Sequence, residues 1–254
     1  YALENKFDVI IKIDADGQHP PIYLTELIKY ILSLPEYKLF LTKGTRYKIR
    51  FNSDYVPFIR RLGTLFLDPI ARAALGYRGL SDVTNGFFGM NSTCASILVK
   101  TKSGSKIRSR YLFESSLLAK CSELDININQ FCMNAIYSEN WNSSMNAYTM
   151  IFPLILFWSN ALIRRILRMY FLNINLGSFL LLSTFVISSL SSTIFFTKVL
   201  PEIQKNILVT AGNSSAFTAS FILAVITFVL FLLYDYSSGI RTNIVFFKSL
   251  INDK

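Results

Sequence analysis

The chain has 254 residues and a mass of 29.0 kDa, which is enough for one ordinary domain with an appended segment. Only 17% of the residues are charged and 52% are hydrophobic, so part of the chain is expected to face something other than water. The same figures exclude a disordered chain, a collagen-like repeat and a coiled coil. The net charge of +10 favours an anionic partner such as phosphate, nucleic acid or a lipid headgroup surface.

The first predicted element is a strand at 7–13, because the run FDVIIKI is short and rich in β-branched residues. Gly17 and the pair Pro20-Pro21 end this strand, and a helix is predicted at 22–34. Asp14 and Asp16 follow the strand, and alternation along it points both carboxylates to the same side. They therefore lie where open α/β sheets bind ligands.

The two carboxylates form a candidate metal site. Oxygen ligands of this kind suit Mg²⁺ or Mn²⁺, which take one or two carboxylates and complete their shell with substrate phosphates and water. An EF-hand is excluded because its sixth position would be His19 instead of Gly and its twelfth Thr25 instead of Glu. A surface turn remains the alternative, since Asp-x-Asp alone is a weak signal.

A basic segment follows between residues 43 and 61. Its cations can hold a phosphate or diphosphate, and arginine matches those oxygens with two parallel donors. A solvated basic face is the alternative. The basic residues are Lys43, Arg46, Lys48, Arg50, Arg60 and Arg61.

Two further polar segments lie before the last predicted strand of this half, at 126–137. One is the run DVTNGFFGM, which contains Asp82, and the other is RYLFE, which ends at Glu114. Asp82 can act as a helix or turn cap, and Asn85-Gly86 can be a simple turn.

The remaining residues limit other kinds of site. The cysteines, Cys94, Cys121 and Cys132, form no CxxC pair, so neither a disulfide framework nor a cysteine zinc site is predicted. His19 is the only histidine, which excludes an HExxH metalloprotease. No zinc finger or RNP-like aromatic string is present, so nucleic acid is not an expected partner.

The second half contains two long uncharged runs, at 176–196 and 216–234. Each is long enough, as a helix, to match the hydrocarbon core of a bilayer. Two buried core helices are the alternative. The basic residues flanking the pair outnumber those between them, which places residues 1–150 and the C-terminal tail, 241–254, in the cytoplasm. The protein is therefore expected in a lipid bilayer, with a transmembrane hairpin at 173–240.

A helix is predicted at 151–172, where Arg164, Arg165 and Arg168 lie among apolar residues. We interpret it as an amphipathic helix at the membrane interface, with its arginines toward lipid phosphate. The alternative is an amphipathic helix packed on the soluble domain.

The motifs, in their order, resemble the family 2 glycosyltransferases, most closely the branch that makes polyprenyl-phosphate sugars, such as dolichol-phosphate mannose synthases and bactoprenol glucosyltransferases. The segments that carry the resemblance are DADGQHPP (14–21), KGTRY (43–47), RRLGT (60–64), DVTNGFFGM (82–90), RYLFE (110–114) and YSENWNSSMN (137–146).

The resemblance implies an α/β, GT-A-like catalytic domain over residues 1–150, a nucleotide-sugar donor, a polyprenyl-phosphate acceptor and transfer with inversion. It also implies roles for individual residues, with Asp82 and Asp16 catalytic and Asp14 and Arg46 near the donor diphosphate. The resemblance further implies that Arg60 and Thr64 bind the acceptor phosphate. It implies that the ligands of Mg²⁺ or Mn²⁺ are Asp14, Asp16 and Gln18.

The chain departs from the family pattern in two places. The family's first strand and its acidic base-binding residue have no counterpart, so the chain is expected to begin inside the catalytic domain. The arginine often found before the family's final glycine-serine segment is also absent, and Asn140 to Ser144 stand there instead. Two alternatives stay open: a family 2 enzyme that acts on a saccharide hydroxyl, and an inactive membrane-anchored relative.

Overall fold

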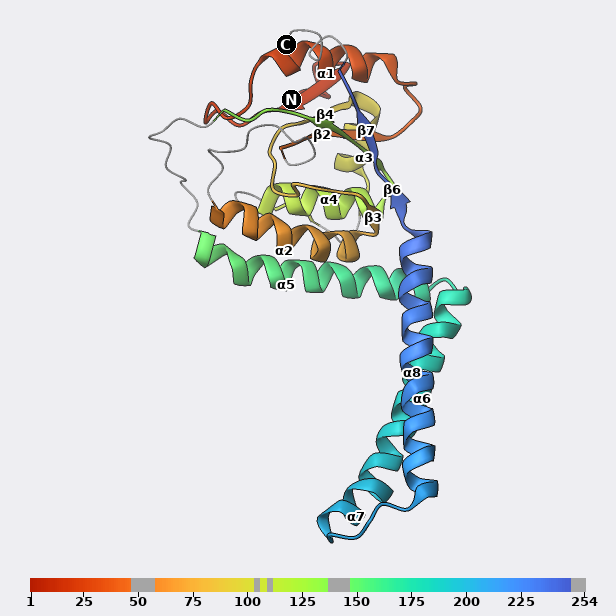
Figure 1. Cartoon of the computed structure of the whole chain (residues 1–254). Coiled ribbons are helices and arrows are strands. Elements are labelled where there is room, and N and C mark those ends of the chain that lie inside the picture. The colour runs from red at the N-terminus through yellow and green to blue at the C-terminus, as the bar shows by residue number, and fades with distance from the viewer. Residues whose placement is uncertain (47–57, 103–105, 109–111, 137–146, 248–254) are drawn as a thin grey trace. The chain divides into compact units, whose positions relative to one another are not determined.

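We describe the protein from a computed structural model. It describes residues 1–46, 58–102, 106–108, 112–136 and 147–247, and among these the side chains of 58–64 and 147–151 are not described. The chain forms two compact units (Figure 1). One comprises Tyr1–Arg165 together with the segment from Ile240 onward, and the other is Ile166–Gly239. We call them the α/β domain and the helical hairpin.

The α/β domain contains a mixed five-stranded sheet in the order β1-β4-β2-β5-β7. Strand β4 runs antiparallel to its neighbours β1 and β2, whereas β2, β5 and β7 are mutually parallel. The predicted α/β class is therefore confirmed. The strands are β1 Val9–Lys12, β2 Phe40–Thr45, β4 Phe88–Asn91, β5 Asn127–Cys132 and β7 Asn243–Val245, and a separate parallel pair is formed by β3 Tyr77–Arg78 and β6 Ile240–Arg241.

Helices cover both faces of the sheet (Figure 1). Helix α1 lies on one face, and α4, α2 and α5 lie beyond the other. The helix predicted at 22–34 is confirmed as α1, and the strands predicted at 7–13 and 126–137 are confirmed as the shorter β1 and β5. The helices are α1 Ile22–Ser33, α2 Phe58–Leu75, α3 Ser92–Lys100, α4 Phe113–Glu123 and α5 Ala147–Ile166.

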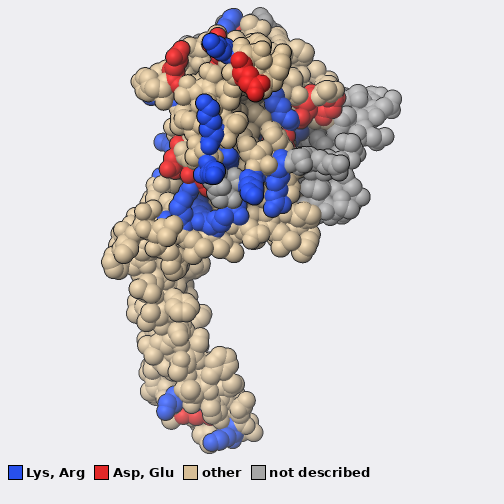
Figure 2. Space-filling view, turned by 180° about the vertical axis from the view of Figure 1, so that it is seen from behind, with Lys and Arg blue, Asp and Glu red and all other residues tan. Residues whose placement is uncertain are grey.

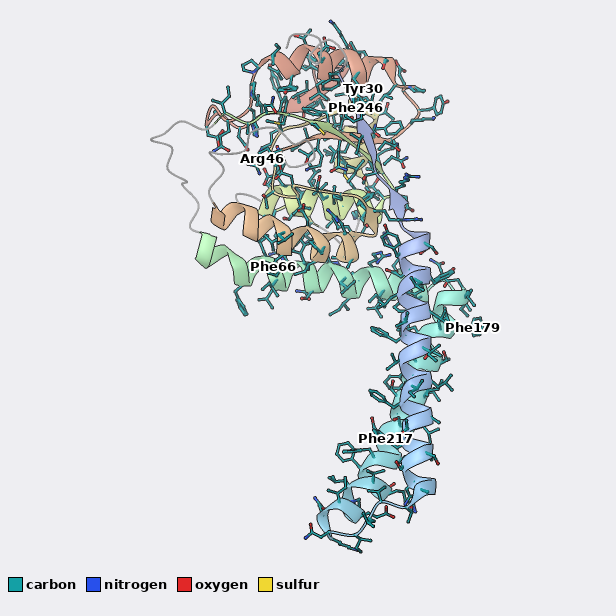
Figure 3. All side chains as sticks on the ribbon, in the orientation of Figure 1. Tyr30, Arg46, Phe66, Phe179, Phe217 and Phe246 are labelled. Atoms are coloured by element: carbon teal, nitrogen blue, oxygen red, sulfur yellow. The ribbon has the colours of Figure 1, made fainter. Side chains whose placement is uncertain are left out.

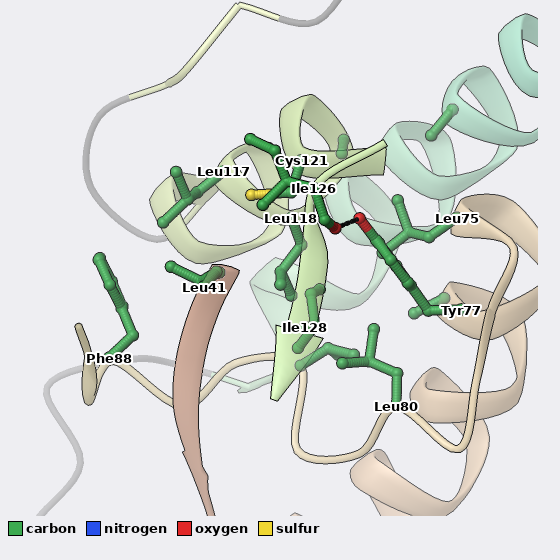
Figure 4. Packing of buried hydrophobic residues seen from close by; sticks show 14 of the residues in the cluster. Leu41, Leu75, Tyr77, Leu80, Phe88, Leu117, Leu118, Cys121, Ile126 and Ile128 are labelled. Atoms are coloured by element: carbon green, nitrogen blue, oxygen red, sulfur yellow. Dashed lines mark hydrogen bonds between the residues drawn. The ribbon is translucent and has the colours of Figure 1, made fainter. Parts of the chain in front are cut away.

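Two apolar clusters hold the helices to the sheet. The larger one joins Leu41 and Ile128 of the sheet to residues of α2, α3, α4 and α5. Tyr77 is fully buried within it and donates its hydroxyl proton to the carbonyl of Ile126 (Figure 4). The smaller cluster places Leu27 of α1 against the opposite face. Because apolar burial drives folding, these clusters fix the helices to the sheet on either side.

Helix α5 packs on the α/β domain through one of its faces. Trp158 is fully buried in the larger cluster, and Arg165, only 4% exposed, donates a 2.8 Å hydrogen bond to the carbonyl of Ala73. Arg164 forms an ion pair with Glu123 at 3.4 Å. The expectation that these two arginines point toward lipid phosphate is therefore wrong. The opposite face remains apolar and exposed, so an interfacial position of 151–172 stays a prediction; it carries Phe152, Ile155, Leu156 and Ile163.

The helical hairpin consists of two long apolar helices that could cross a membrane. Helix α6, Leu176–Ile194, continues through a π-helical turn, Phe195–Val199, into α7, Leu200–Gln204, and it packs along α8, Ala211–Ser238. Side chains such as Phe179 project outward from these helices (Figure 3). On the face shown in Figure 2, the middle of the hairpin carries no Lys, Arg, Asp or Glu at its surface.

The segment after the hairpin returns to the α/β domain. Residues 241–254 were expected to form a tail, but β6 pairs with β3, and β7 adds a strand beside β5. The last residue before the hairpin and the first residue after it both contact Gly76. The side chain of Arg165 packs against Gly76, and the backbone N–H of Ile240 donates a 2.9 Å hydrogen bond to the carbonyl of Gly76. The sequence prediction missed this because a three-residue strand has no recognisable alternation.

Candidate functional site

The predicted polar residues gather at one edge of the sheet. Strands β1, β2 and β5 all end there, and the antiparallel β4 begins there, because Phe88 is the register partner of both Lys12 and Lys43. Asp14 follows β1, Arg46 follows β2, and Asp82 lies in the loop before β4. The chain thus brings residues from three separate motifs to the same edge of one sheet.

The turn after β1 sets the orientation of its acidic residues. Gly17 has a φ of 75°, a left-handed conformation that glycine adopts without steric cost. The carboxylate of Asp16 accepts a 3.1 Å hydrogen bond from the backbone N–H of Gln18, which is the usual way an aspartate closes such a turn. Asp16 is otherwise exposed, so a ligand can reach its carboxylate.

The two residues after this turn are buried with polar atoms unused. Gln18 is 3% exposed and His19 is 6% exposed, and His19 packs its ring near Phe87 at 5.4 Å between centroids. Within the described part of the chain, neither Gln18 Nε2 nor His19 Nδ1 has a hydrogen-bond partner. Because an unpaired buried polar atom is costly, this pair indicates a place that a polar ligand completes.

The pKa of His19 responds to the acidic and basic residues of the candidate site. Burial lowers the pKa of its imidazole and Arg46 lowers it further, whereas the charges of Asp14, Asp16 and Asp82 act in the opposite direction. These four charges belong to residues at the same edge of the sheet. Burial has the largest effect on this pKa, so the neutral imidazole is favoured.

Asp14 is held by a residue that the sequence analysis did not select. Lys12 Nζ lies 2.6 Å from Asp14 Oδ1 and 2.7 Å from Glu114 Oε1, so one ammonium joins two carboxylates. Burial alone would lower the pKa of Lys12, but Asp14 and Glu114 outweigh it and raise that pKa. The available signal was the lysine itself, which interrupts an otherwise apolar strand in VIIKI.

Arg46 and Asp82 form a second, more deeply buried ion pair (Figure 3 labels Arg46). Arg46 Nε donates to Asp82 Oδ2 at 2.7 Å and Nη2 donates to Oδ1 at 2.6 Å, a bidentate arrangement. The backbone N–H of Arg46 and the side-chain amide of Asn85 each add a 3.0 Å hydrogen bond to Oδ2. Asp82 therefore fixes the position of the guanidinium.

The surroundings of Asp82 keep it ionised. Burial alone would raise its pKa, but Arg46, Lys43 and Asn85 outweigh burial and lower the pKa to about 2. Asp82 has a φ of 52°, and its backbone N–H donates a 2.9 Å hydrogen bond to the carboxylate of Asp68. Lys43, which belongs to the motif KGTRY, is buried behind the loop and donates to the carbonyls of Ser81 and Asp82. A carboxylate of this kind binds a cation well and accepts a proton poorly.

A divalent cation fits the donor set in this region. Among the residues that the structure describes, no three His, Cys, Asp or Glu side chains cluster to form a metal site. Mg²⁺ and Mn²⁺ do not need such a cluster, because one or two carboxylates suffice when phosphates complete the shell. Asp14 and Asp16 supply the carboxylates, and the unpaired Gln18 Nε2 can donate to a phosphate oxygen.

Other predicted residues lie partly or wholly outside the description. Arg60 and Thr64 belong to helix α2, but their side chains are not among those described. The motif YSENWNSSMN (137–146) lies entirely outside the described residues, as do Tyr47 and the first two residues of RYLFE. Their predicted roles remain predictions.

No protein-family model matches the sequence, and a search of curated proteins finds no match either. Support for a function therefore comes from the residues of the α/β domain and of the helical hairpin.

Proposed function

We propose that the protein is a membrane glycosyltransferase with a GT-A-like domain, which moves a sugar from a nucleotide-sugar donor to a polyprenyl phosphate. The observation that carries the proposal is that Asp14, Asp16, Arg46 and Asp82 lie at the same edge of one sheet. In the resembling family these motifs hold a donor diphosphate, and here they come together although they are far apart in the sequence.

The chemistry requires the bond between the anomeric carbon and the donor diphosphate to break, with its electron pair leaving on the diphosphate. An oxygen of the acceptor phosphate forms the new bond from the opposite side, which inverts the anomeric centre. Asp14 and Asp16, with Gln18, would hold Mg²⁺ or Mn²⁺, and the bound ion would neutralise charge developing on the leaving group. The protein's own contribution is to orient the two phosphates.

The state of Asp82 favours a phosphate acceptor over a hydroxyl. A hydroxyl must lose its proton as it reacts, and Asp82 was the best candidate base on sequence grounds. With a pKa of about 2 and a bidentate arginine, Asp82 is a poor proton acceptor near neutral pH. A phosphate is already ionised at that pH and needs no base. We therefore assign Asp82 to positioning Arg46, and Arg46 to contact with a phosphate.

The helical hairpin fits a lipid acceptor. A polyprenyl chain is insoluble in water, so the enzyme must meet its phosphate at the membrane interface. Two apolar helices of sufficient length supply the attachment, and the exposed apolar face of α5 suits the interface. By the positive-inside rule, the α/β domain lies on the cytoplasmic side.

A transfer assay tests the proposal. The full-length protein, with any coding sequence that precedes Tyr1, is supplied in detergent with Mn²⁺, radiolabelled UDP- and GDP-sugars and a polyprenyl phosphate. We expect label to enter the butanol-extractable lipid fraction. Asp16→Ala should lower the rate by at least about 100-fold, the effect typical of removing one group that stabilises transition-state charge.

Asp8→Ala is the matched control, because Asp8 is exposed just before the same strand. It should leave the rate unchanged. Unchanged turnover in Asp16→Ala would refute the role of the carboxylate pair. Label found only in water-soluble saccharide would instead establish the hydroxyl acceptor, and no transfer from any donor would support the inactive relative.

A further inference from the structure

Lys12 occupies a place in the site that none of the proposed roles explains. It ends strand β1, and its ammonium reaches across to Glu114 at the start of helix α4 as well as to Asp14. The three side chains are only partly exposed, at 33% for Lys12, 40% for Asp14 and 16% for Glu114. Ion pairs with this degree of burial are screened less by water than fully exposed ones.

The surrounding residues are shaped to this arrangement. Gly86 lies so close that a Cβ there would collide with Asp14 Oδ2 and would come within 2.6 Å of Lys12 Nζ. The ammonium also lies 5.6 Å from the ring centre of Phe113 and 6.0 Å from that of Phe88, which favours a cation at that point. The ammonium therefore has three kinds of partner: two carboxylates, two aromatic rings and the carbonyl of Gly86 at 3.4 Å.

The consequence is electrostatic. A divalent cation at Asp14 and Asp16 needs their negative charge, but Lys12 already neutralises Asp14 at 2.6 Å. Two cations close to one carboxylate repel each other. The hydrogen bond of Lys12 to Glu114, at 2.7 Å, offers the ammonium a second carboxylate if Asp14 is taken from it.

We propose that Lys12 is a positioning residue that neutralises Asp14 in the free protein and competes with the divalent cation for it, with Glu114 retaining the ammonium once Asp14 is released. The proposal rests on the carboxylate site of the proposed function. Glu114 belongs to the motif RYLFE, to which no role had been assigned. In this proposal it stabilises the Lys12 ammonium after Asp14 has bound the cation.

Binding of Mn²⁺ to the full-length protein in detergent tests this without any turnover. Free Mn²⁺ gives a sharp paramagnetic resonance signal that is lost on binding, so its titration yields a Kd. Lys12→Met keeps the aliphatic contact with the rings but removes the charge, and it should lower the Kd by at least about tenfold. Should Lys12→Met fail to fold, Lys12→Gln carries the same expectation.

Glu114→Gln should act in the opposite direction, because Lys12 then has only Asp14 as its anionic partner. We expect the Kd for Mn²⁺ to rise about three- to tenfold. In the Lys12→Met background the same change should alter the Kd by less than about twofold, since no ammonium remains to be shared. Equal weakening in both backgrounds would mean that Glu114 acts on the cation directly, and it would overturn the proposal.

The matched control is Lys29→Met, because Lys29 forms an exposed ion pair with Glu26 on α1, at 3.1 Å. It makes the same change in net charge and should leave the Kd unchanged. An unchanged or raised Kd in Lys12→Met overturns the proposal. Asp16→Ala distinguishes failure of the proposed metal site from failure of the proposed competition. If Asp16→Ala binds Mn²⁺ as the wild type does, the carboxylate site is refuted. If Asp16→Ala loses binding and Lys12→Met shows no tighter binding, only the competition is refuted.

Discussion

Arg46 and Asp82 lie 36 positions apart in the sequence, yet they form a bidentate ion pair with N–O distances of 2.6 and 2.7 Å. The carboxylate is 0% exposed and the arginine side chain is 9% exposed. Removing one partner of such a pair leaves the other charge buried and unpaired. We expect Asp82→Asn to lower the free energy of unfolding by about 3–5 kcal/mol at pH 7, measured by denaturant unfolding in detergent.

The stability difference between wild type and Asp82→Asn should depend on pH. The pKa of Asp82 is lowered from 3.8 to about 2, so its ionisation stabilises the fold above about pH 4, and that contribution is lost as the pH falls through 2. The difference between wild type and Asp82→Asn should therefore shrink between pH 4 and 2. Asp8→Asn, at an exposed position, is the control and should match the wild type throughout. A difference that stays constant with pH would contradict the ion pair.

Gly86→Ala is predicted to impair the site while sparing the fold. The φ of Gly86 is not in the left-handed region, so the backbone accepts alanine. The added Cβ would displace the ends of the Asp14 and Lys12 side chains from their ion pair without meeting any backbone atom among its three nearest neighbours. We expect weaker Mn²⁺ binding and slower transfer, with a change in unfolding free energy below about 1 kcal/mol. Gly212→Ala, where nothing lies within 4 Å, is the matched control, and Mn²⁺ binding equal to wild type in Gly86→Ala would contradict the prediction.

Trp158 should hold helix α5 to the α/β domain. It is fully buried among residues of other helices, so Trp158→Ala should lower the unfolding free energy by about 3–5 kcal/mol, followed by circular dichroism in denaturant. Phe152 lies on the opposite face of the same helix and is 68% exposed. Its replacement by alanine should change stability by less than about 0.5 kcal/mol. Similar losses in both variants would mean that α5 is not docked by one face.

Cysteine labelling tests whether the hairpin crosses a membrane. The native Cys94 and Cys121 are buried, and burial raises the pKa of both thiols, that of Cys94 to about 12, so they should not react. In a background with Cys132→Ser, Leu208→Cys marks the loop between α7 and α8, and Ser33→Cys marks the α/β domain. An impermeant maleimide added to intact cells should label the first variant and should reach the second only after permeabilisation. Labelling of both from one side would show that the helices do not span.

The sequence was informative where a pattern is long or chemically distinctive. A short β-branched run located β1, the Pro pair located the start of α1, and two charge-free runs located α6 and α8. The pair Asp14 and Asp16 could be placed at the end of a strand because Gly and Pro stop strands. These are local rules, and they hold without knowledge of the tertiary structure.

Contacts between distant segments could not be predicted in this way. Nothing in RYLFE shows that Glu114 meets Lys12, because the distance between them depends on how α4 packs on the sheet. Asp82 was a candidate base for a hydroxyl acceptor, and only its enclosure by Arg46, Lys43 and Asn85 shows that its pKa is lowered. Likewise, Arg165 has the sequence context of a lipid-facing cation, but the packing of Trp158 turns that side of α5 inward.

The meeting of Arg165 and Ile240 at Gly76 makes the hairpin an insertion within the α/β domain, since β6 and β7 are synthesised only after both long helices. The ribosome must therefore deliver the apolar helices before the last strand can join the sheet, so the α/β domain is completed only after both helices have been made. The same junction offers a place for excision: a short glycine-rich linker from Arg165 to Ile240 would retain every strand in the described part of the chain and remove the two long apolar helices.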